Sequence, residues 1–508
     1  MKKLNSILFH RSVVVGLSVL IQVLVLAAVI LVFSEYEAAF HWCCILVSFL
    51  ATLWILGRRM EPAYKIAWLI PILLMPVFGG IFYLLVGGGG VSGRTQRKLQ
   101  GIAQRCRETL AGDFSSDRMM SQEEDAAGQA RYLEQYASCP VYDDTETEYF
   151  ELGDLAYKKM LEELEKAEKY IFMEYFIIQE GVLWDSILEV LERKAAQGVE
   201  VRVLYDDFGC MYTLPPDYDK HLQAKGIQCM VFGRLVPVIS IRQNNRNHKK
   251  ITVIDGKVAF TGGMNLADEY INQRDRFGHW KDSAILLRGK AAWSMTVMFL
   301  SMWDHCANLE EDYEHFRPQN MPERTGCGWV QPYTDTPLDH EKVSQTVYLN
   351  MISRARKTIY ITTPYLIIDE ATNTALCNAA KAGVDVRIIT PHIPDKRYVF
   401  EVTKAHYPPL LEAGVKIYEY TPGFIHAKNF MVDSTYATVG TVNMDYRSLF
   451  LHFENGVLLY GTDCIADIRQ DFLDTLERCE EITLRKSRRL SIVGALYRSI
   501  LRVFAPLM

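Results

Sequence analysis

The chain has 508 residues and a formal net charge of −6, and 49% of its residues are hydrophobic. This length exceeds what one hydrophobic core usually organises, so we expect at least two domains. The acidic balance disfavours a protein that wraps nucleic acid, and the ordinary hydrophobic content limits any membrane portion to a minority of the chain. The 11 cysteines include no CxxC pair, which indicates neither a disulfide framework nor a zinc cluster and fits a reducing compartment.

Apolar runs dominate residues 1–90, which are predicted to form a membrane anchor. Residues 13–33 carry no charged side chain and are long enough to cross the hydrocarbon core as a helix, and residues 39–56 form a second such run. Basic residues flank this pair on both sides, so the positive-inside rule places both of its ends in the cytoplasm. A third apolar run, 66–86, is interrupted by prolines and glycines and followed by basic residues, which favours a re-entrant or interfacial segment over the alternative of a third span.

The rest of the chain reads as a repeat that follows a polar, weakly structured linker over residues 91–130. KYIFMEYFII (169–178) and GVEVRVLYDDFG (198–209) are typical of buried strands, and a helical pattern separates them. The same order recurs in KTIYITTPYLI (357–367) and GVDVRIITPH (383–392). This alternation predicts an α/β fold of two duplicated lobes, each a largely parallel or mixed sheet flanked by helices. We expect the first lobe over residues 131–315 and the second over residues 316–482.

One polar pattern occurs late in each lobe. NRNHKKITVID and IHAKNFMVD share a His, a Lys two residues later and an Asp five residues after that, and each is followed by a glycine-containing turn and an Asn at the same interval. The two sets are His248, Lys250, Asp255, Gly262, Gly263 and Asn265, and His426, Lys428, Asp433, Gly440, Thr441 and Asn443. In an extended segment, His and Lys two residues apart face the same side. The glycine turn allows the Asn to return beside them.

Two copies of this pattern supply what one copy lacks. Cleavage of a phosphodiester needs a nucleophile and a proton donor for the leaving alkoxide, and two histidines that face one phosphorus provide both. Lys250, Lys428, Asn265 and Asn443 are candidates to bind the phosphoryl oxygens and to stabilise their charge in the transition state. Because two lysines provide the charge that magnesium provides in other phosphoryl transfers, we expect neither a metal nor another cofactor.

The doubled HxKxxxxD pattern with its GGxN or GTxN resembles the phospholipase D superfamily, and NRNHKK, YDDFG, TTPYLI and TPGFIHAK resemble bacterial cardiolipin synthases. The likeness covers nearly the whole chain. It implies reversible transfer of a phosphatidyl group from one phosphatidylglycerol to another through a phosphohistidine intermediate, which gives cardiolipin and glycerol. It also implies a multi-pass protein of the bacterial plasma membrane whose catalytic lobes face the cytoplasm, with those lipids and glycerol as partners and no nucleic acid.

Several residue roles stay open at this point. The resemblance favours His248 as nucleophile and His426 as acid and base, but the pseudo-symmetry allows the reverse. Asp255 and Asp433 are either catalytic or structural, because aspartates commonly form turns after strands. Asp282 in HWKDSAI and Glu454 in LHFENGV resemble the acidic residues that orient the family's imidazoles, and a structural role is the alternative. His452, which lies outside the repeated pattern, is expected to be structural.

The C-terminal stretch 483–508 is basic and amphipathic. Its apolar clusters alternate with arginines at helical spacing, which predicts a helix that lies either in the membrane interface or on the protein's own body. Two other functions are compatible with the whole pattern. A phospholipase D-type hydrolase would use the same residues with water, and a non-catalytic scaffold would use them to bind anionic lipid.

Overall fold

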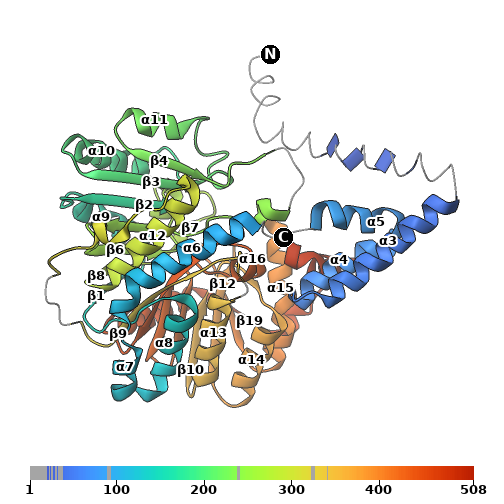
Figure 1. The fold of residues 1–508 in the computed structure, drawn as a ribbon. Helices are drawn as coiled ribbons and strands as arrows, with labels where there is room; N and C mark the ends of the chain where they lie inside the picture. The colour runs from blue at the N-terminus through green and yellow to red at the C-terminus, as the bar shows by residue number, and fades with distance from the viewer. Residues whose placement is uncertain are drawn as a thin grey trace.

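The computed structural model describes residues 38–87, 93–236, 241–321, 326–339 and 341–507, together with positions 20, 21, 23, 24, 27, 28 and 31. In these residues, two large β-sheets form two lobes, with helices packed around and between them (Figure 1). Most of the predicted span 13–33 lies outside the described residues.

The first lobe contains a seven-stranded sheet in the order β1-β8-β6-β5-β2-β3-β4. Its strands are β1 (Glu146–Phe150), β2 (Tyr170–Tyr175), β3 (Glu200–Asp206), β4 (Gln228–Phe232), β5 (Ile251–Ile254), β6 (Val258–Gly262) and β8 (Ala284–Arg288). Its helices are α9 (Gly153–Leu164), α10 (Val182–Ala196) and α11 (Tyr218–Ala224). Only β2, β3 and β4 pair in parallel, and the other pairings are antiparallel. The sheet is therefore mixed, which is one of the two expected forms, because tight turns and short returns join its later strands.

The second lobe repeats this order in an eight-stranded sheet, β19-β13-β12-β10-β15-β16-β18-β9. Its strands are β9 (Trp329–Asp335), β10 (Thr358–Thr362), β12 (Asp385–Pro391), β13 (Lys416–Tyr420), β15 (Asn429–Val432), β16 (Tyr436–Gly440), β18 (Glu454–Tyr460) and β19 (Cys479–Ile482). Its helices are α13 (Val343–Arg354), α14 (Glu370–Lys381), α15 (Arg397–Glu412) and α17 (Cys464–Leu476). Again β10, β12 and β13 are parallel and the strands from β15 to β9 are antiparallel. The two sheets confirm the predicted duplication.

The two lobes share one hydrophobic core. Helix α12 (Ala291–Ala307) is buried along most of its length and contacts strands of both sheets. Phe299 on α12 stacks on Phe172 of β2 at a ring-centroid distance of 4.8 Å, and the same cluster extends to Val330 of β9. Because each buried side chain of this size contributes about 2 kcal/mol, the lobes are held in a fixed relation, and so is any site between them.

The stretch predicted as a weakly structured linker is mostly helical. It forms α6 (Gly93–Leu110), η2 (Ala111–Asp113), α7 (Ser116–Gln122) and α8 (Glu124–Ala137). Helix α6 buries Ile102 and Leu110, and its Arg105 pairs with Asp304 of α12 at 3.0 Å. The linker prediction is wrong because a polar composition conceals a helix with one apolar side that packs on the body.

The second and third apolar runs form a helical hairpin that projects from the lobes (Figure 1). The predicted run 39–56 becomes α3 (Ala38–Gly57), and the third run becomes α4 (Pro62–Leu74), α5 (Pro76–Phe82) and the π-helical turn η1 (Tyr83–Gly87). The chain breaks at Met75, just before Pro76, as the prolines predict. At Gly80 a Cβ would lie 2.6 Å from the Cα of Ser48, so glycine permits the close contact of α5 with α3. In the described part of the chain, no helix combines the length and apolarity needed to cross a membrane.

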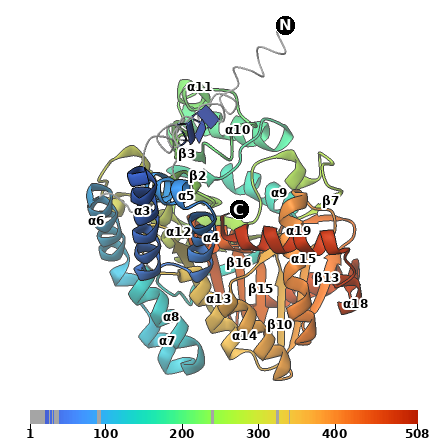
Figure 2. The same cartoon turned by 90° about the vertical axis from the view of Figure 1, so that its right-hand side faces the viewer.

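The C-terminal stretch docks on the second lobe. It forms α18 (Leu484–Ser487), α19 (Ile492–Phe504) and η6 (Ala505–Leu507), and Figure 2 shows α19 lying across the lobe in front of α15. Arg498 pairs with Glu401 of α15 at 2.7 Å. The remaining short elements are β7 (His279–Lys281), β11 (Leu366–Ile367), β14 (Gly423–Ile425), β17 (Met444–Asp445), α16 (Tyr446–Phe450), η3 (Ile241–Asn244), η4 (Asp268–Ile271) and η5 (Tyr313–Phe316).

Candidate active site

Two short backbone pairings join the lobes at the centre of the molecule. Strand β7 of the first lobe runs parallel to β14 of the second, and Asn247 forms a parallel bridge with Phe453. The backbone N–H of His248 donates to the carbonyl of Phe453 at 2.9 Å, and the N–H of His426 donates to the carbonyl of Lys281 at 2.7 Å. Each motif histidine therefore lies where its own lobe is hydrogen-bonded to the other.

These pairings place a carboxylate of one lobe beside the imidazole of the other. Glu454 follows Phe453, and its two carboxylate oxygens lie 2.9 and 3.0 Å from Nδ1 of His248. Asp282 follows Lys281, and its Oδ2 lies 2.7 Å from Nδ1 of His426. Both carboxylates are fully buried. A Nδ1–H that donates to a carboxylate leaves Nε2 free to attack or to exchange a proton. Asp282 and Glu454 thus stand where an imidazole-orienting role requires them.

The two lysines lie beside the histidines and keep their charge available. Lys250 Nζ donates to the carbonyl of His248 at 2.6 Å, and Lys428 Nζ donates in the same way to the carbonyl of His426. Both side chains are buried. Burial lowers the pKa of Lys250 to about 7 and that of Lys428 to about 8. Because each ammonium is bonded to a carbonyl rather than to a carboxylate, the site offers positive charge to an anionic phosphodiester.

Burial and the neighbouring lysines also change the histidines. Burial, together with the charge of Lys428, lowers the pKa of His426 to about 4. Burial and the charges of Lys250 and Lys428 hold the pKa of His248 well below its usual value. Near pH 7 both imidazoles are therefore neutral. A phosphodiester anion placed between them favours the protonated form of an imidazole, because an opposite charge nearby raises a histidine pKa.

The lysine pKa values predict how activity depends on pH. As pH rises through about 7 and about 8, Lys250 and Lys428 lose the protons that give them positive charge. We therefore expect kcat/KM, which reports the free enzyme, to fall over this range. A pH–rate profile in detergent micelles with a fixed lipid composition measures it. A kcat/KM that stays constant from about pH 6 to about pH 9 would contradict this prediction.

Asp255 and Asp433 lie at the far ends of the strands that follow the histidines. Asp255 accepts hydrogen bonds from three successive backbone N–H groups, those of Glu168, Lys169 and Tyr170, at 2.8–2.9 Å. Asp433 makes the equivalent bonds at 2.7–2.8 Å to the N–H groups that begin β10 (Arg356, Lys357 and Thr358). Both aspartates adopt positive φ angles, 53° and 52°, as turn residues. These contacts tie β5 to β2 and β15 to β10 and favour the structural alternative for both aspartates.

Asp433→Ala is expected to destabilise the protein and to leave the folded fraction active. The substitution removes the acceptor of three backbone donors, so the free energy of unfolding should fall by about 2–4 kcal/mol. Thermal unfolding and kcat, corrected for folded protein, measure the two effects. Asp467→Ala, at an exposed position on α17, provides the control. A loss of kcat of more than about a hundredfold with unchanged thermal stability would restore a catalytic role.

The two asparagines of the repeat differ. Asn265 uses its amide within the fold, since Oδ1 accepts from the N–H of Ile177 at 3.0 Å and Nδ2 donates to the hydroxyl of Tyr270 at 2.7 Å. Asn443 is buried, and its Oδ1 has no hydrogen-bond partner among the described residues. The predicted phosphate-binding role therefore fits Asn443 better than Asn265, which supports the loop around Tyr270.

Gly263 and Thr441, which occupy the same place in the two motifs, also differ in their contacts. The hydroxyl of Thr441 donates to Glu454 Oε2 and so supports the carboxylate that bonds His248. At Gly263, a Cβ would lie 2.0 Å from Oδ1 of Asp282. The position therefore has no room for a side chain in this arrangement.

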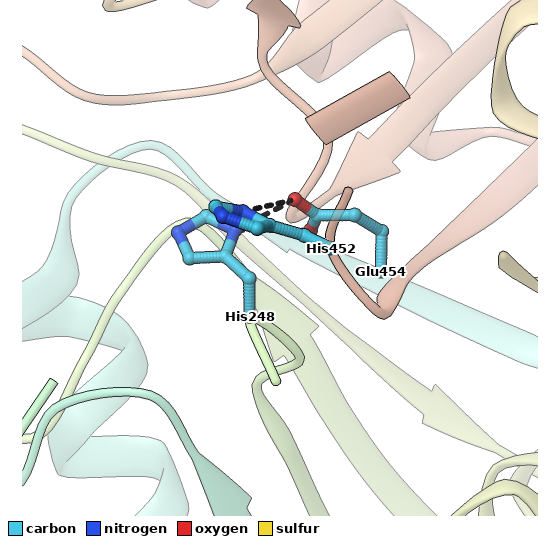
Figure 3. A group of neighbouring side chains, drawn as sticks. All are labelled: His248, His452 and Glu454. Atoms are coloured by element: carbon cyan, nitrogen blue, oxygen red, sulfur yellow. Dashed lines mark hydrogen bonds and ion pairs between the residues drawn. The ribbon is translucent and has the colours of Figure 1, made fainter. Parts of the chain in front are cut away.

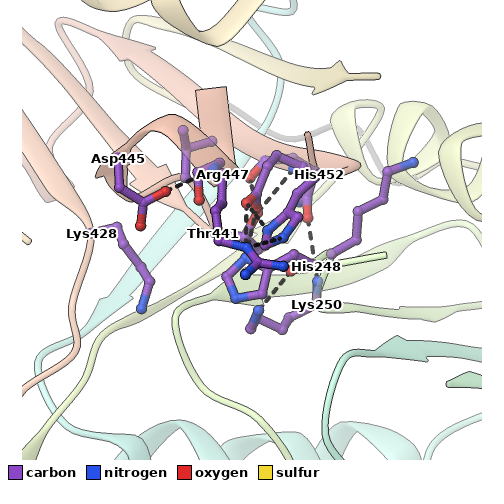
Figure 4. Close-up of polar contacts among 12 residues, drawn as sticks. His248, Lys250, Lys428, Thr441, Asp445, Arg447 and His452 are labelled. Atoms are coloured by element: carbon purple, nitrogen blue, oxygen red, sulfur yellow. Dashed lines mark hydrogen bonds and ion pairs between the residues drawn. The ribbon is translucent and has the colours of Figure 1, made fainter. Parts of the chain in front are cut away.

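His452, expected to be structural, lies in the site. Its ring is 5.4 Å from that of His248, and its Nδ1 is 3.7 Å from Glu454 Oε1 (Figure 3). Arg447 lies beside it, with Nε 3.3 Å from His452 Nε2 (Figure 4). Sequence reasoning missed both residues, and the one signal was their position shortly before Glu454 in RSLFLHFEN.

The same cluster is where a metal ion would find ligands. In the described part of the chain, His248, His452 and Glu454 form the one group of three whose ligand atoms all lie within 4.8 Å of one another. Glu454 already accepts a hydrogen bond from His248, and a metal would have to replace that bond. The arrangement as it stands can instead present two oriented imidazoles and two ammonium groups to one phosphate.

Comparison with known proteins gives consistent results. The family model described as "Cardiolipin synthase, PLD-like domain" matches residues 160–303 and 348–476, and a model described as "Phospholipase D-nuclease N-terminal" matches residues 46–88. The chain is 43% identical over 463 residues to an uncharacterised protein of Streptococcus mutans. This alignment covers 90% of this chain and 99% of that protein. It is 35% identical over 453 residues to cardiolipin synthase 2 of Bacillus anthracis, which covers 89% of this chain and 88% of the relative.

A solved structure shows the same fold. The crystal structure of phosphatidylserine synthase from Haemophilus influenzae matches with a TM-score of 0.55 at 14% identity, over 75% of this chain and 98% of the other. At this identity the likeness concerns the arrangement of the two lobes alone.

Proposed function

Because the chain belongs to the cardiolipin synthase family of the phospholipase D superfamily, we propose that it transfers a phosphatidyl group from one phosphatidylglycerol to another, giving cardiolipin and glycerol. The observation that carries this proposal is the crossed pair of dyads, His248 with Glu454 and His426 with Asp282. Each dyad draws one member from each lobe, and Lys428 and His426 act electrostatically on His248, which supports one site that contains both imidazoles.

In the first half of the reaction, Nε2 of one histidine attacks the phosphorus of phosphatidylglycerol. The bond from phosphorus to the glycerol oxygen breaks, and the other histidine gives its proton to that oxygen. The products of this step are free glycerol and a phosphatidyl-histidine. Lys250 and Lys428 stabilise the charge on the equatorial oxygens of the five-coordinate transition state.

The second half reverses these roles. A hydroxyl of a second phosphatidylglycerol gives its proton to the histidine that acted as acid, and its oxygen attacks the phosphorus. The bond between nitrogen and phosphorus breaks and restores the first histidine. Each step has a counterpart in the other direction, which makes the transfer reversible. The assignment of His248 as nucleophile rests on the family resemblance, and both dyads have the contacts that either role needs.

We place the lobes on the cytoplasmic side of the plasma membrane, with residues 1–90 as the anchor. The relatives support association with a membrane, and α3 exposes large apolar side chains such as Trp42 and Trp54. Basic residues on both sides of the pair of apolar runs 13–33 and 39–56 give the orientation. A multi-pass arrangement of the anchor is part of this proposal.

Product analysis tests the function. The purified protein is incubated with phosphatidylglycerol in detergent micelles, and the lipids and the water-soluble products are quantified by mass spectrometry. Cardiolipin and free glycerol in equal amounts are expected. Phosphatidic acid in place of cardiolipin would show hydrolysis, and no turnover would show a scaffold. His315→Ala, an exposed histidine on η5, is the matched control and should keep full activity.

A further inference from the structure

Helix α19 turns a row of apolar side chains away from the protein. Ile492, Val493 and Leu496 are 90%, 77% and 62% exposed, and Tyr497 and Ile500 continue the same surface. A single exposed apolar residue needs no explanation, but five on one short helix mark an interaction surface.

The opposite side of the helix is fixed to the second lobe. Arg498 pairs with Glu401, and Leu501 and Ala505 pack into a cluster with Val402 of α15. The apolar row is therefore held in a defined direction and is not free to turn inward.

A groove of about 400 Å³ runs between α15 and α19 and is lined by cations. The cations are Lys404, Arg488, Arg498 and Arg502, and three serine hydroxyls lie among them. Arg488 pairs with Glu412, and Arg498 pairs with Glu401. In the described part of the chain, no carboxylate pairs with Lys404 or Arg502. Two cations without a carboxylate partner, of which Lys404 lies over the ring of Phe400, make the groove complementary to a phosphate group.

The surface is continuous with the N-terminal hairpin. Figure 2 shows α19 lying across the side of the molecule from which the α3–α5 hairpin projects in Figure 1. Ala505 of η6 belongs to a cluster that includes Ala63 and Tyr64 at the start of α4. A bilayer that holds the hairpin would therefore meet α19 lengthwise, as an interfacial helix requires.

From these contacts we propose that α19 and the cationic groove beside it form a docking surface for the anionic bilayer. The apolar row enters the headgroup boundary, and the phosphate of an anionic lipid occupies the groove between Lys404 and Arg502. The docking rests on the membrane placement of the protein and requires no step of the phosphatidyl transfer.

Contacts at the C-terminal end of α19 also connect the docking surface to the candidate active site. Ala505 packs against Tyr446, the first residue of α16, and Arg447 follows it beside His452. Docking of α19 therefore fixes how far the histidines lie from the lipid surface.

Hydrogen–deuterium exchange of the full-length protein in lipid nanodiscs tests the proposal. Discs of phosphatidylcholine are compared with discs that also contain phosphatidylserine, an anionic lipid outside the proposed reaction. Amides of residues 492–504 are expected to exchange at least about 25-fold more slowly in the anionic discs, and this ratio should fall about fivefold for each cation removed in Lys404→Gln and Arg502→Gln. Leu496→Asp should abolish it, because a charge then enters the apolar face.

Two controls distinguish docking through the groove from an effect of any exposed lysine and from the proposed phosphatidyl transfer. Lys220→Gln, on α11 of the first lobe, removes an exposed lysine outside the groove and should leave the protection unchanged. His248→Ala should also keep the protection, so a failure of the proposed transfer leaves this result intact. Equal exchange in both kinds of disc, or full protection in the Lys404→Gln and Arg502→Gln double variant, would overturn the docking surface.

Discussion

Replacing His248 or His426 with alanine is expected to lower the rate of cardiolipin formation by at least about 10⁴-fold. Either substitution leaves a site with one imidazole, and one imidazole cannot both bond to phosphorus and protonate the departing glycerol. The shared core should keep both variants folded, because the site lies between lobes that are joined through α12 and not through the histidines. The measurement is the initial rate of cardiolipin formation, with thermal unfolding recorded for each variant.

The double variant His248→Ala/His426→Ala adds a check on the shared site. Substitutions of residues that act as a unit have non-additive effects on activity. The rate of the double variant should therefore lie within about tenfold of the rate of the slower single variant. Losses that multiply would indicate two independent sites, one in each lobe.

Glu454→Gln and Asp282→Asn are expected to lower kcat by about 10²–10⁴-fold. Each amide can present an N–H to Nδ1 of the facing imidazole, which favours the tautomer with its proton on Nε2 and blocks attack from that atom. Glu454→Gln should also weaken the support from Thr441, whose hydroxyl donates to this carboxylate. Steady-state kinetics on phosphatidylglycerol measure the effect, with Asp467→Asn on α17 as the control.

The crossing of the dyads gives this prediction a second part. Glu454→Gln should add little to the loss already caused by His248→Ala, and Asp282→Asn should add little to the loss caused by His426→Ala. A kcat within threefold of wild type for both carboxylate variants, about 0.7 kcal/mol, would show that the imidazoles need no orienting partner.

The parts of this structure that the sequence predicted are those with a local or repeated signal. The strands around 169–178 and 357–367 follow from their apolar, β-branched composition, and the duplication follows from the repeated order of motifs. The His and Lys pairs were predictable because two copies of one motif with the same spacing are improbable by chance.

The parts that sequence reasoning missed depend on contacts between distant segments. The resemblance named Asp282 and Glu454 as imidazole-orienting residues, but nothing local indicates which carboxylate bonds which histidine, since this depends on β7 pairing with β14 and on Asn247 pairing with Phe453. His452 follows α16, and its contacts at the site are with Arg447 and with His248 of the other lobe. The role of Asp255 and Asp433 could not be decided from the sequence, because aspartate is common both among catalytic residues and in turns.

The most direct test of one site with two histidines uses an activated substrate, phosphatidyl-p-nitrophenol, whose leaving group needs no proton from the enzyme. Rapid-mixing absorbance follows the release of p-nitrophenol by His248→Ala and His426→Ala. The variant that keeps the nucleophile should release one equivalent per enzyme and then stall, with the phosphatidyl group found on its remaining histidine after an alkaline quench. The other variant should release none. A burst in neither variant, or steady turnover in both, would contradict a phosphatidyl-histidine formed between the two lobes.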